Sequence, residues 1–132
     1  MLKDAAADRS TRVLLVDGDV DLLNLLTYAL ELRGYSVARA QDAQSALAVV
    51  AEAQLDLVLL GCCVPFGFEL CRHIHATSPL PIIMLTALSS DECGGPSLDD
   101  GADEYVVKPF SLKVLAARME ALLRHGRAVA KP

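Results

Sequence analysis

Short apolar runs alternate along the chain with longer segments whose apolar residues recur at helical spacing. Four of the runs are rich in aliphatic residues and have the length of strands that are buried inside a sheet. In one further segment, larger residues alternate with smaller ones, which predicts a strand at the edge of the sheet. The expected strands span 13–16, 35–39 (the edge strand), 57–60, 82–85 and 105–107.

Four amphipathic segments are expected to be helices. Asp19 or Asp21 can cap the first, which ends at Gly34, and Asp42 can cap the second. Their expected inward-facing residues are Leu22, Leu26, Ala29 and Leu30 in the first, Ala43, Leu47, Val50 and Ala53 in the second, Leu70 and Ile74 in the third (68–77), and Leu112, Leu115, Met119 and Leu122 in the last (111–126).

The segment between the last two strands is a weak helix candidate. Cys93-Gly94-Gly95-Pro96 lies where this helix would begin. Gly costs about 1 kcal/mol per helical position, and Pro fits only the first turn. We therefore expect a short, late or mobile helix here, which is either a partner-binding lid or a surface irregularity.

The order of these elements predicts a single α/β domain. Strands that alternate with helices form right-handed crossovers and a parallel sheet, which is the doubly wound class. The 132 residues are enough for one domain with a real core. We expect this domain at 12–125, between a flexible leader at 1–11 and a linker or flexible tail at 126–132.

Composition narrows the functional class. The formal net charge is -5, so a basic footprint for nucleic acid is absent, and any DNA binding would need another segment. No apolar run reaches the roughly 20 residues of a membrane helix, and the first residues lack the apolar core of a secretory signal. We expect a cytoplasmic protein whose four cysteines are reduced thiols.

Polar residues at the strand ends indicate where chemistry would occur. Open α/β sheets bind ligands at the carboxyl ends of their strands, where this chain places Asp17, Gly61, Thr86 and Lys108. A carboxylate, a hydroxyl and an ammonium could together form a pocket for an oxyanion and a metal ion, since Mg²⁺ prefers oxygen ligands.

These residues lie in motifs that resemble the receiver domain of two-component response regulators. The segments that show this resemblance are VLLVDGDVDLL, DLVLL, PIIMLTA, GADEYVVKPF and SLKVLAARMEALLR. The resemblance extends from about Arg12 to His125. It implies a (βα)5 flavodoxin- or CheY-like sheet with strand order 2-1-3-4-5. The last helix and the tail look most like the subgroup that carries a C-terminal winged-helix DNA-binding domain.

The resemblance also implies residue roles. The family transfers a phosphoryl group from a histidine kinase to an Asp at the end of the third strand, aided by Mg²⁺ on an acidic pair. Asp17 matches the first acid of that pair, Thr86 the switch hydroxyl, Tyr105 the switch aromatic and Lys108 the lysine. The bond between Lys108 and Pro109 matches one that is usually cis in the family.

Three departures from the family pattern surround this site. The second acid is replaced by Gly18, and the phosphoacceptor by Gly61. The following loop, Pro65-Phe66-Gly67-Phe68, is about two residues short and lacks its acid. Glycine can neither attack phosphorus nor ligate a metal through a side chain. We therefore expect no cofactor and weak or absent Mg²⁺ binding, with Asp17 and Asp19 as the remaining candidate ligands.

Several residues have a plain structural alternative. Asp17 and Lys108 are expected to form a partly buried ion pair, because breaking such a pair strands a charge. Thr86 and Tyr105 are either a retained conformational switch or framework residues. The cysteines are expected to be small buried hydrophobes. Cys71 lies one helical turn from His75 and near His73, but no second pair completes a zinc site.

We therefore expect an atypical receiver, not an enzyme, that regulates an output domain or a partner by protein contacts without aspartyl phosphorylation. A homodimer through the fourth helix, the fifth strand and the fifth helix is the expected route, with Tyr105 in the interface. Two alternatives remain open. One is a receiver that is phosphorylated on a substitute acid, Asp17 or Asp19. The other is a redox sensor that uses Cys62, Cys63 or Cys93.

Overall fold

The computed structural model describes residues 11–61, 67–87 and 101–125, which form a five-stranded parallel sheet with the order β2-β1-β3-β4-β5. The strands are β1 (Arg12–Val16), β2 (Ser36–Ala40), β3 (Leu57–Gly61), β4 (Ile82–Ala87) and β5 (Glu104–Lys108). The predicted parallel sheet, its strand order and the edge position of the second strand are confirmed.

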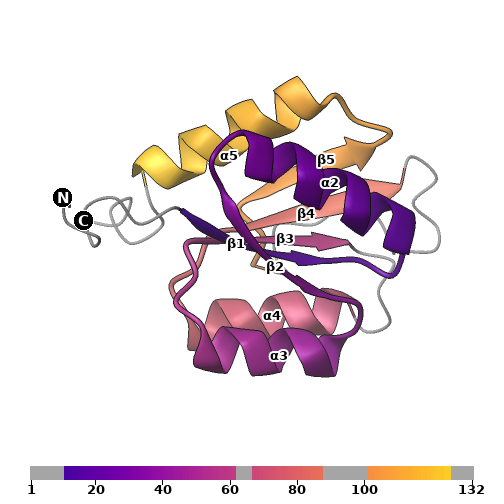
Figure 1. Ribbon diagram of the computed structural model, residues 1–132. Coiled ribbons are helices and arrows are strands. Elements are labelled where there is room, and N and C mark those ends of the chain that lie inside the picture. Colours follow the sequence, from indigo (N-terminus) through magenta and orange to yellow (C-terminus); the bar gives the residue numbers. More distant parts are fainter. Residues whose placement is uncertain (1–10, 62–66, 88–100, 126–132) are drawn as a thin grey trace, which may run out of the picture.

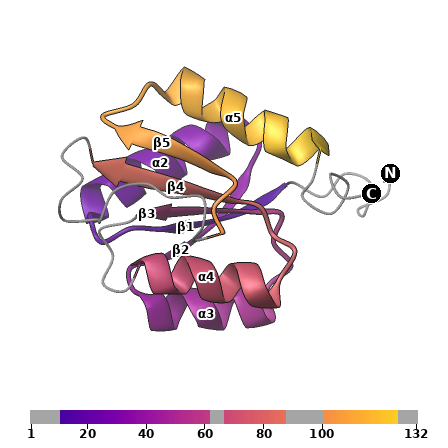
Figure 2. The same ribbon diagram turned by 180° about the vertical axis from the view of Figure 1, so that it is seen from behind.

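Helices cover both faces of the sheet, as Figures 1 and 2 show. One face carries α2 (Val20–Leu32) and α5 (Leu112–His125), and the other carries α3 (Ala43–Glu52) and α4 (Gly67–Thr77). The expected weak helix after β4 falls on 88–100, and the expected leader and tail at 1–10 and 126–132, all outside the described residues. None of the helices in the described segments is long and apolar enough to cross a membrane.

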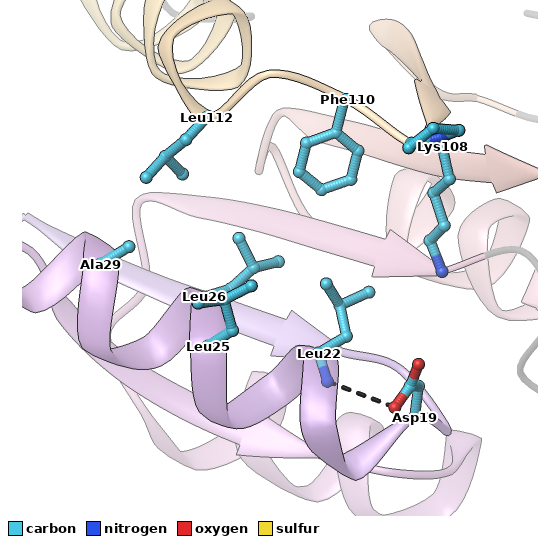
Figure 3. Close-up of a pocket in the computed structure, with 9 residues that line it drawn as sticks. Asp19, Leu22, Leu25, Leu26, Ala29, Lys108, Phe110 and Leu112 are labelled. Carbon is cyan, nitrogen blue, oxygen red and sulfur yellow. Dashed lines mark hydrogen bonds between the residues drawn. The ribbon is translucent and has the colours of Figure 1, made fainter.

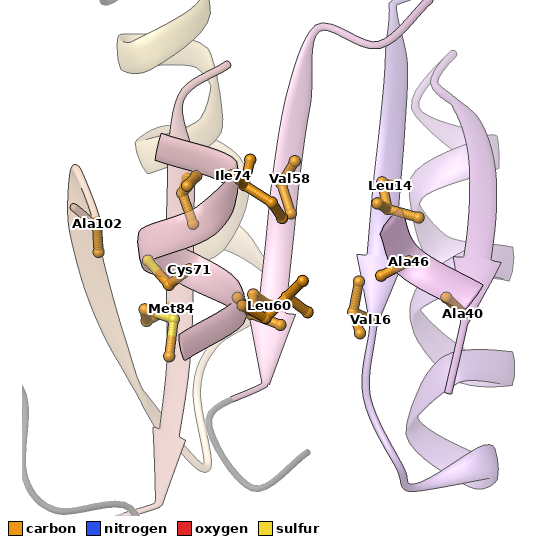
Figure 4. Packing of buried hydrophobic residues seen from close by; sticks show 12 residues of the cluster. Leu14, Val16, Ala40, Ala46, Val58, Leu60, Cys71, Ile74, Met84 and Ala102 are labelled. Atoms are coloured by element: carbon orange, nitrogen blue, oxygen red, sulfur yellow. The ribbon is translucent and has the colours of Figure 1, made fainter. Parts of the chain in front are cut away.

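The strands bury side chains on both faces, which explains why their sequences are almost continuously apolar. Successive residues of a strand point to opposite sides, so each strand contributes to two clusters. The cluster beneath α3 and α4, drawn in Figure 4, includes Leu14, Val16, Val58, Leu60, Ile82 and Met84. The cluster beneath α2 and α5 includes Val13, Leu15, Leu57, Leu59, Ile83 and Leu85.

Capping residues set the helix boundaries. Asp19, rather than Asp21, is the N-cap of α2, and its carboxylate accepts hydrogen bonds from the backbone N–H groups of Asp21 and Leu22. The Asp42 carboxylate caps α3 by accepting from the N–H of Ser45 at 2.8 Å, as predicted. Gly34 follows α2 with a φ of 97°, a conformation that favours glycine.

The predicted inward faces of α2 and α3 are confirmed in part. In α2 the fully buried positions are Leu23, Leu26 and Leu30, whereas Leu22 and Ala29 are only half-buried. The leucines of this helix cover about half of its circumference, so the pattern does not fix which of them are fully buried. In α3 the predicted Ala43, Leu47 and Val50 pack half-buried against the core. The fully buried residue is Ala46, which the predicted stripe did not include, because a single alanine adds little to a hydrophobic pattern.

Candidate functional site

The candidate site lies at the carboxyl edge of the sheet, where four neighbouring strands bring its residues together. Asp17 follows β1, Gly61 ends β3 and Lys108 ends β5. Thr86 lies inside β4, opposite Val107 of β5, and not after the end of its strand as the sequence suggested. The strand order therefore places the expected residues side by side along this edge.

The carboxylate of Asp17 is at the centre of the site and has a partner on each oxygen. Lys108 Nζ lies 2.8 Å from Oδ2, and the backbone N–H of Asp19 donates to Oδ1 at 2.9 Å. The Asp17 side chain is 5% exposed and that of Lys108 is 24% exposed. This arrangement is the expected ion pair, in which a buried carboxylate is neutralised by a charge-assisted hydrogen bond.

Gly61 lies directly against this carboxylate. A Cβ atom placed on Gly61 would be 2.9 Å from Asp17 Cγ, still closer to Asp17 Oδ2, and 3.3 Å from the carbonyl oxygen of Val16. The Asp17 carboxylate therefore occupies the space into which a side chain at position 61 would extend. By contrast, a Cβ on Gly18 would meet no atom within 4 Å. The two glycines thus differ, since a side chain at position 61 would collide with Asp17, whereas one at position 18 would have free space.

The residues present do not fit a magnesium ion. Mg²⁺ requires near-octahedral oxygen coordination, commonly from one or two carboxylates, substrate oxygens and water. Both oxygens of Asp17 already have hydrogen-bond partners, and Asp19 caps α2. Positions 18 and 61 offer no side-chain oxygen. Among the described residues, no group of three or more His, Cys, Asp or Glu side chains could hold a metal ion.

Thr86 and Tyr105 lie on the same face of the sheet. Tyr105 is opposite Met84 in the register between β4 and β5, and Thr86 is two residues beyond Met84. Thr86 is buried, and Tyr105 is half-buried against the cluster beneath α3 and α4. This placement is compatible with a switch and with a framework role, so the two alternatives of the sequence stay open.

The cysteine and histidine residues considered as metal ligands differ in their burial. Cys71 is buried in the core, whereas His73 and His75 are exposed on α4. Cys62, Cys63 and Cys93, on which the redox hypothesis rests, lie outside the described residues. The bond between Lys108 and Pro109 is cis, as the resemblance implied.

An apolar groove of about 370 Å³ lies beside the site and was not predicted from the sequence. It runs between α2 and the junction of β5 with α5, with Asp19 and Lys108 at one end, as Figure 3 shows. The lining residues are Asp19, Leu22, Leu25, Leu26, Ala29, Lys108, Pro109, Phe110 and Leu112. Lys108 therefore borders both the groove and the Asp17 carboxylate.

Residues 13–120 match the family model of the response regulator receiver domain. The response regulator MprA of Mycolicibacterium vanbaalenii is 44% identical over 116 residues, which cover 86% of this chain and 50% of that protein. The DNA-binding response regulator MtrA of Mycobacterium tuberculosis is 42% identical over 117 residues, covering 87% and 51%. This chain thus spans about half the length of these relatives.

Solved structures agree with this match. A CheY-like response regulator receiver domain protein from Methanospirillum hungatei has a TM-score of 0.81 at 32% identity, covering 88% of this chain and 95% of that chain. A two-component response regulator from Clostridium difficile has a TM-score of 0.78 at 30% identity, covering 87% and 97%.

Proposed function

The chain belongs to the family of response regulator receiver domains, and we propose that it works as a receiver without aspartyl phosphorylation. In this proposal the domain regulates an attached output domain or a separate partner through protein contacts. The chain has no acceptor carboxylate at position 61, and its pocket is held in one arrangement by its own side chains.

One observation carries the proposal, namely that the Asp17 carboxylate fills the space beside Gly61 while it is paired with Lys108. In this arrangement the lysine neutralises a carboxylate of the protein itself. An incoming phosphoryl group would have to compete with Asp17 for the ammonium. The pocket therefore has neither the nucleophile nor the free cationic group that phosphoryl transfer would use.

The substitute acids are poor replacements for the missing nucleophile. Asp17 is almost fully buried, and both of its oxygens are engaged. Asp19 is exposed, but its Oδ1 accepts two backbone N–H groups at the start of α2. Attack by either carboxylate would break existing hydrogen bonds, and attack by Asp17 would also strand Lys108. We therefore favour the phosphorylation-independent receiver over a receiver with a substitute acid.

Incubation with acetyl phosphate and Mg²⁺, followed by intact-mass measurement, tests the proposal. We expect no phosphate adduct on this chain. The receiver domain of the MtrA relative, treated identically, controls for the activity of the phosphodonor. A stoichiometric adduct on this chain, located by peptide mapping to Asp17 or Asp19, would contradict the proposal and favour the alternative.

The proposed output of the domain, control of transcription, rests on the names of its relatives. The names of the MtrA and AfsQ1 relatives describe a DNA-binding response regulator and a transcriptional regulatory protein. We propose that this domain likewise controls transcription through an output domain that lies outside the sequence considered, while it makes no nucleic-acid contact itself. A homodimer across β5 and α5 stays a prediction, since the helix that would complete that face falls on 88–100, outside the described residues.

A further inference from the structure

The outward side of α2 carries an unusual set of exposed apolar side chains. Leu25, Tyr28 and Leu32 are 63%, 65% and 71% exposed, and together they form the outer stripe of α2. Among the described residues, six large hydrophobic side chains are exposed, and four of them belong to this one helix when Val20 is included. Single exposed hydrophobics need no explanation, but a stripe along one helix marks an interaction surface.

The spacing of the stripe is that of a helix-packing seam. Leu25, Tyr28 and Leu32 are three and four residues apart, which is the repeat with which two helices pack against each other. The stripe lies opposite the residues that α2 buries in the core. The helix therefore has two apolar sides, one that packs on the sheet and one that has no partner within the described residues.

We propose that the partner of the outer stripe is α2 of a second copy of this chain, packed antiparallel about a two-fold axis near Tyr28. In this arrangement Tyr28 meets the partner's Tyr28, and Leu25 meets the partner's Leu32. Such a contact is isologous and closes as a dimer, because the same surface is used on both copies.

Charge complementarity favours this antiparallel pairing. Asn24 and Glu31 lie seven residues apart on one flank of the stripe, the flank that faces β2. Arg39 of β2 donates a hydrogen bond from Nη1 to the side-chain oxygen of Asn24 at 2.9 Å, so its guanidinium lies beside that flank. An antiparallel pair places residue 24 opposite residue 31, so the partner's Glu31 meets Arg39, and the two-fold axis repeats this ion pair.

Glu31 and Arg39, the two charged residues that would meet, are available for this contact. Neither Glu31 nor Arg39 forms an ion pair with another residue in the described ranges 11–61, 67–87 and 101–125. A guanidinium has five N–H donors, so Arg39 can keep its bond to Asn24 and still bind a carboxylate. A parallel two-fold pair would instead bring opposite flanks of the stripe together, so Glu31 would not meet the partner's Arg39.

The face formed by β5 and α5 offers less for self-association. Its exposed large hydrophobics in the described residues are Val107 and Val114, which are smaller than those of the outer stripe. Two of its charges are already paired within one chain, because Arg118 Nη1 lies 2.7 Å from Glu104 Oε2. The described residues therefore favour α2 as the surface that a second copy covers.

Sedimentation of the full chain over a concentration series tests the surface. We expect a reversible dimer with a dissociation constant in the micromolar range, which Leu32→Asp weakens by about tenfold or more. Val114→Asp on α5 tests the competing face across β5 and α5, and under the α2 proposal it should leave the dissociation constant unchanged. Circular dichroism of both variants checks that the fold is retained. A chain that stays monomeric, or a dimer that Val114→Asp disrupts and Leu32→Asp does not, would overturn the proposal.

A charge exchange tests the orientation independently. Glu31→Arg and Arg39→Glu should each weaken the dimer several-fold, because each places like charges across the interface. The double variant restores opposite charges, and we expect it to regain a dissociation constant within about threefold of the original. Failure of the double variant to recover would contradict the antiparallel arrangement. Because the readout is association alone, it is independent of the acetyl phosphate experiment.

Discussion

At the scale of single residues, the Asp17 carboxylate has three roles in this pocket. It neutralises Lys108, it binds the N–H that begins the turn into α2, and it fills the space beside Gly61. Each of these contacts depends on the others, because moving the carboxylate away from β3 would also strand a lysine. The loss of a side chain at position 61 is thus accommodated by a side chain from the neighbouring strand.

The closed space at position 61 gives a prediction. Gly61→Ala should lower the free energy of unfolding by about 1–3 kcal/mol, because the new methyl group forces the Asp17 carboxylate or the β1 backbone to shift. Gly18→Ala is the matched control, and we expect a change of less than about 0.5 kcal/mol, since nothing lies within 4 Å of its Cβ position. Urea unfolding measures both values. Equal effects at the two glycines would show that Asp17 does not fill the space.

The sequence predicted the identities of the site residues and the ion pair between Asp17 and Lys108, but not that the Asp17 carboxylate fills the space beside Gly61. Asp17, Thr86 and Lys108 could be placed at strand ends because apolar runs stop or nearly stop there. The direction of the Asp17 side chain could not be predicted, since it depends on how closely β1 and β3 approach. The absence of a carboxylate at position 61 was visible in the sequence, whereas the group that fills its space was not.

At the scale of elements, α2 shows how a helix can be assigned correctly while its buried face is predicted only in part. Its cap and its end are encoded locally by Asp19 and Gly34, so the sequence placed its boundaries well. Its leucines cover about half of its circumference, so only the packing against β1 and β2 decides which of them are fully buried. Leu25 and Leu32, together with Tyr28, stay exposed as the outer stripe, and this stripe is the basis for the proposed dimer.

The cap of α3 gives a prediction about acid stability. The backbone hydrogen bond from Ser45, supported by the Ser45 side chain, lowers the pKa of Asp42 below its ordinary value of 3.8. The folded pKa is therefore lower than the unfolded pKa. The cap stabilises the fold at pH values above the unfolded pKa, and its contribution is lost as the pH falls through the folded pKa.

Asp42→Asn should remove this part of the acid sensitivity, because an asparagine oxygen caps the helix without titrating. We expect the urea midpoint of this variant to fall less than that of the original chain when the pH is lowered from about 5 to about 2.5. Asp21→Asn is the control, since Asp21 is an acidic residue that caps no helix in the structure. An unchanged pH dependence in Asp42→Asn would show that the cap contributes nothing measurable.

At the scale of the whole molecule, the fold has the architecture of its family, and the strand-end pocket has a single carboxylate paired with a lysine. The sheet order, the cis bond before Pro109 and the buried strands agree with the receiver family. The resemblance implies a pocket with three carboxylates, and at the matching positions this chain has Asp17, Gly18 and Gly61. A pocket with three close carboxylates is relieved by a divalent cation, whereas a single carboxylate paired with Lys108 is already neutral.

This balance of charge predicts how the domain responds to Mg²⁺. A ligand that binds only the folded state with a dissociation constant of about 1 mM would add about 1.4 kcal/mol at a concentration of about 10 mM. For a domain of this size, that gain raises the melting temperature by about 5 °C. We expect a rise of less than about 2 °C here, because the Asp17 carboxylate at the end of β1 is held by Lys108. Sodium chloride at matched ionic strength controls for charge screening, and calorimetric titration that gave sub-millimolar affinity would show that Mg²⁺ can displace Lys108 from Asp17.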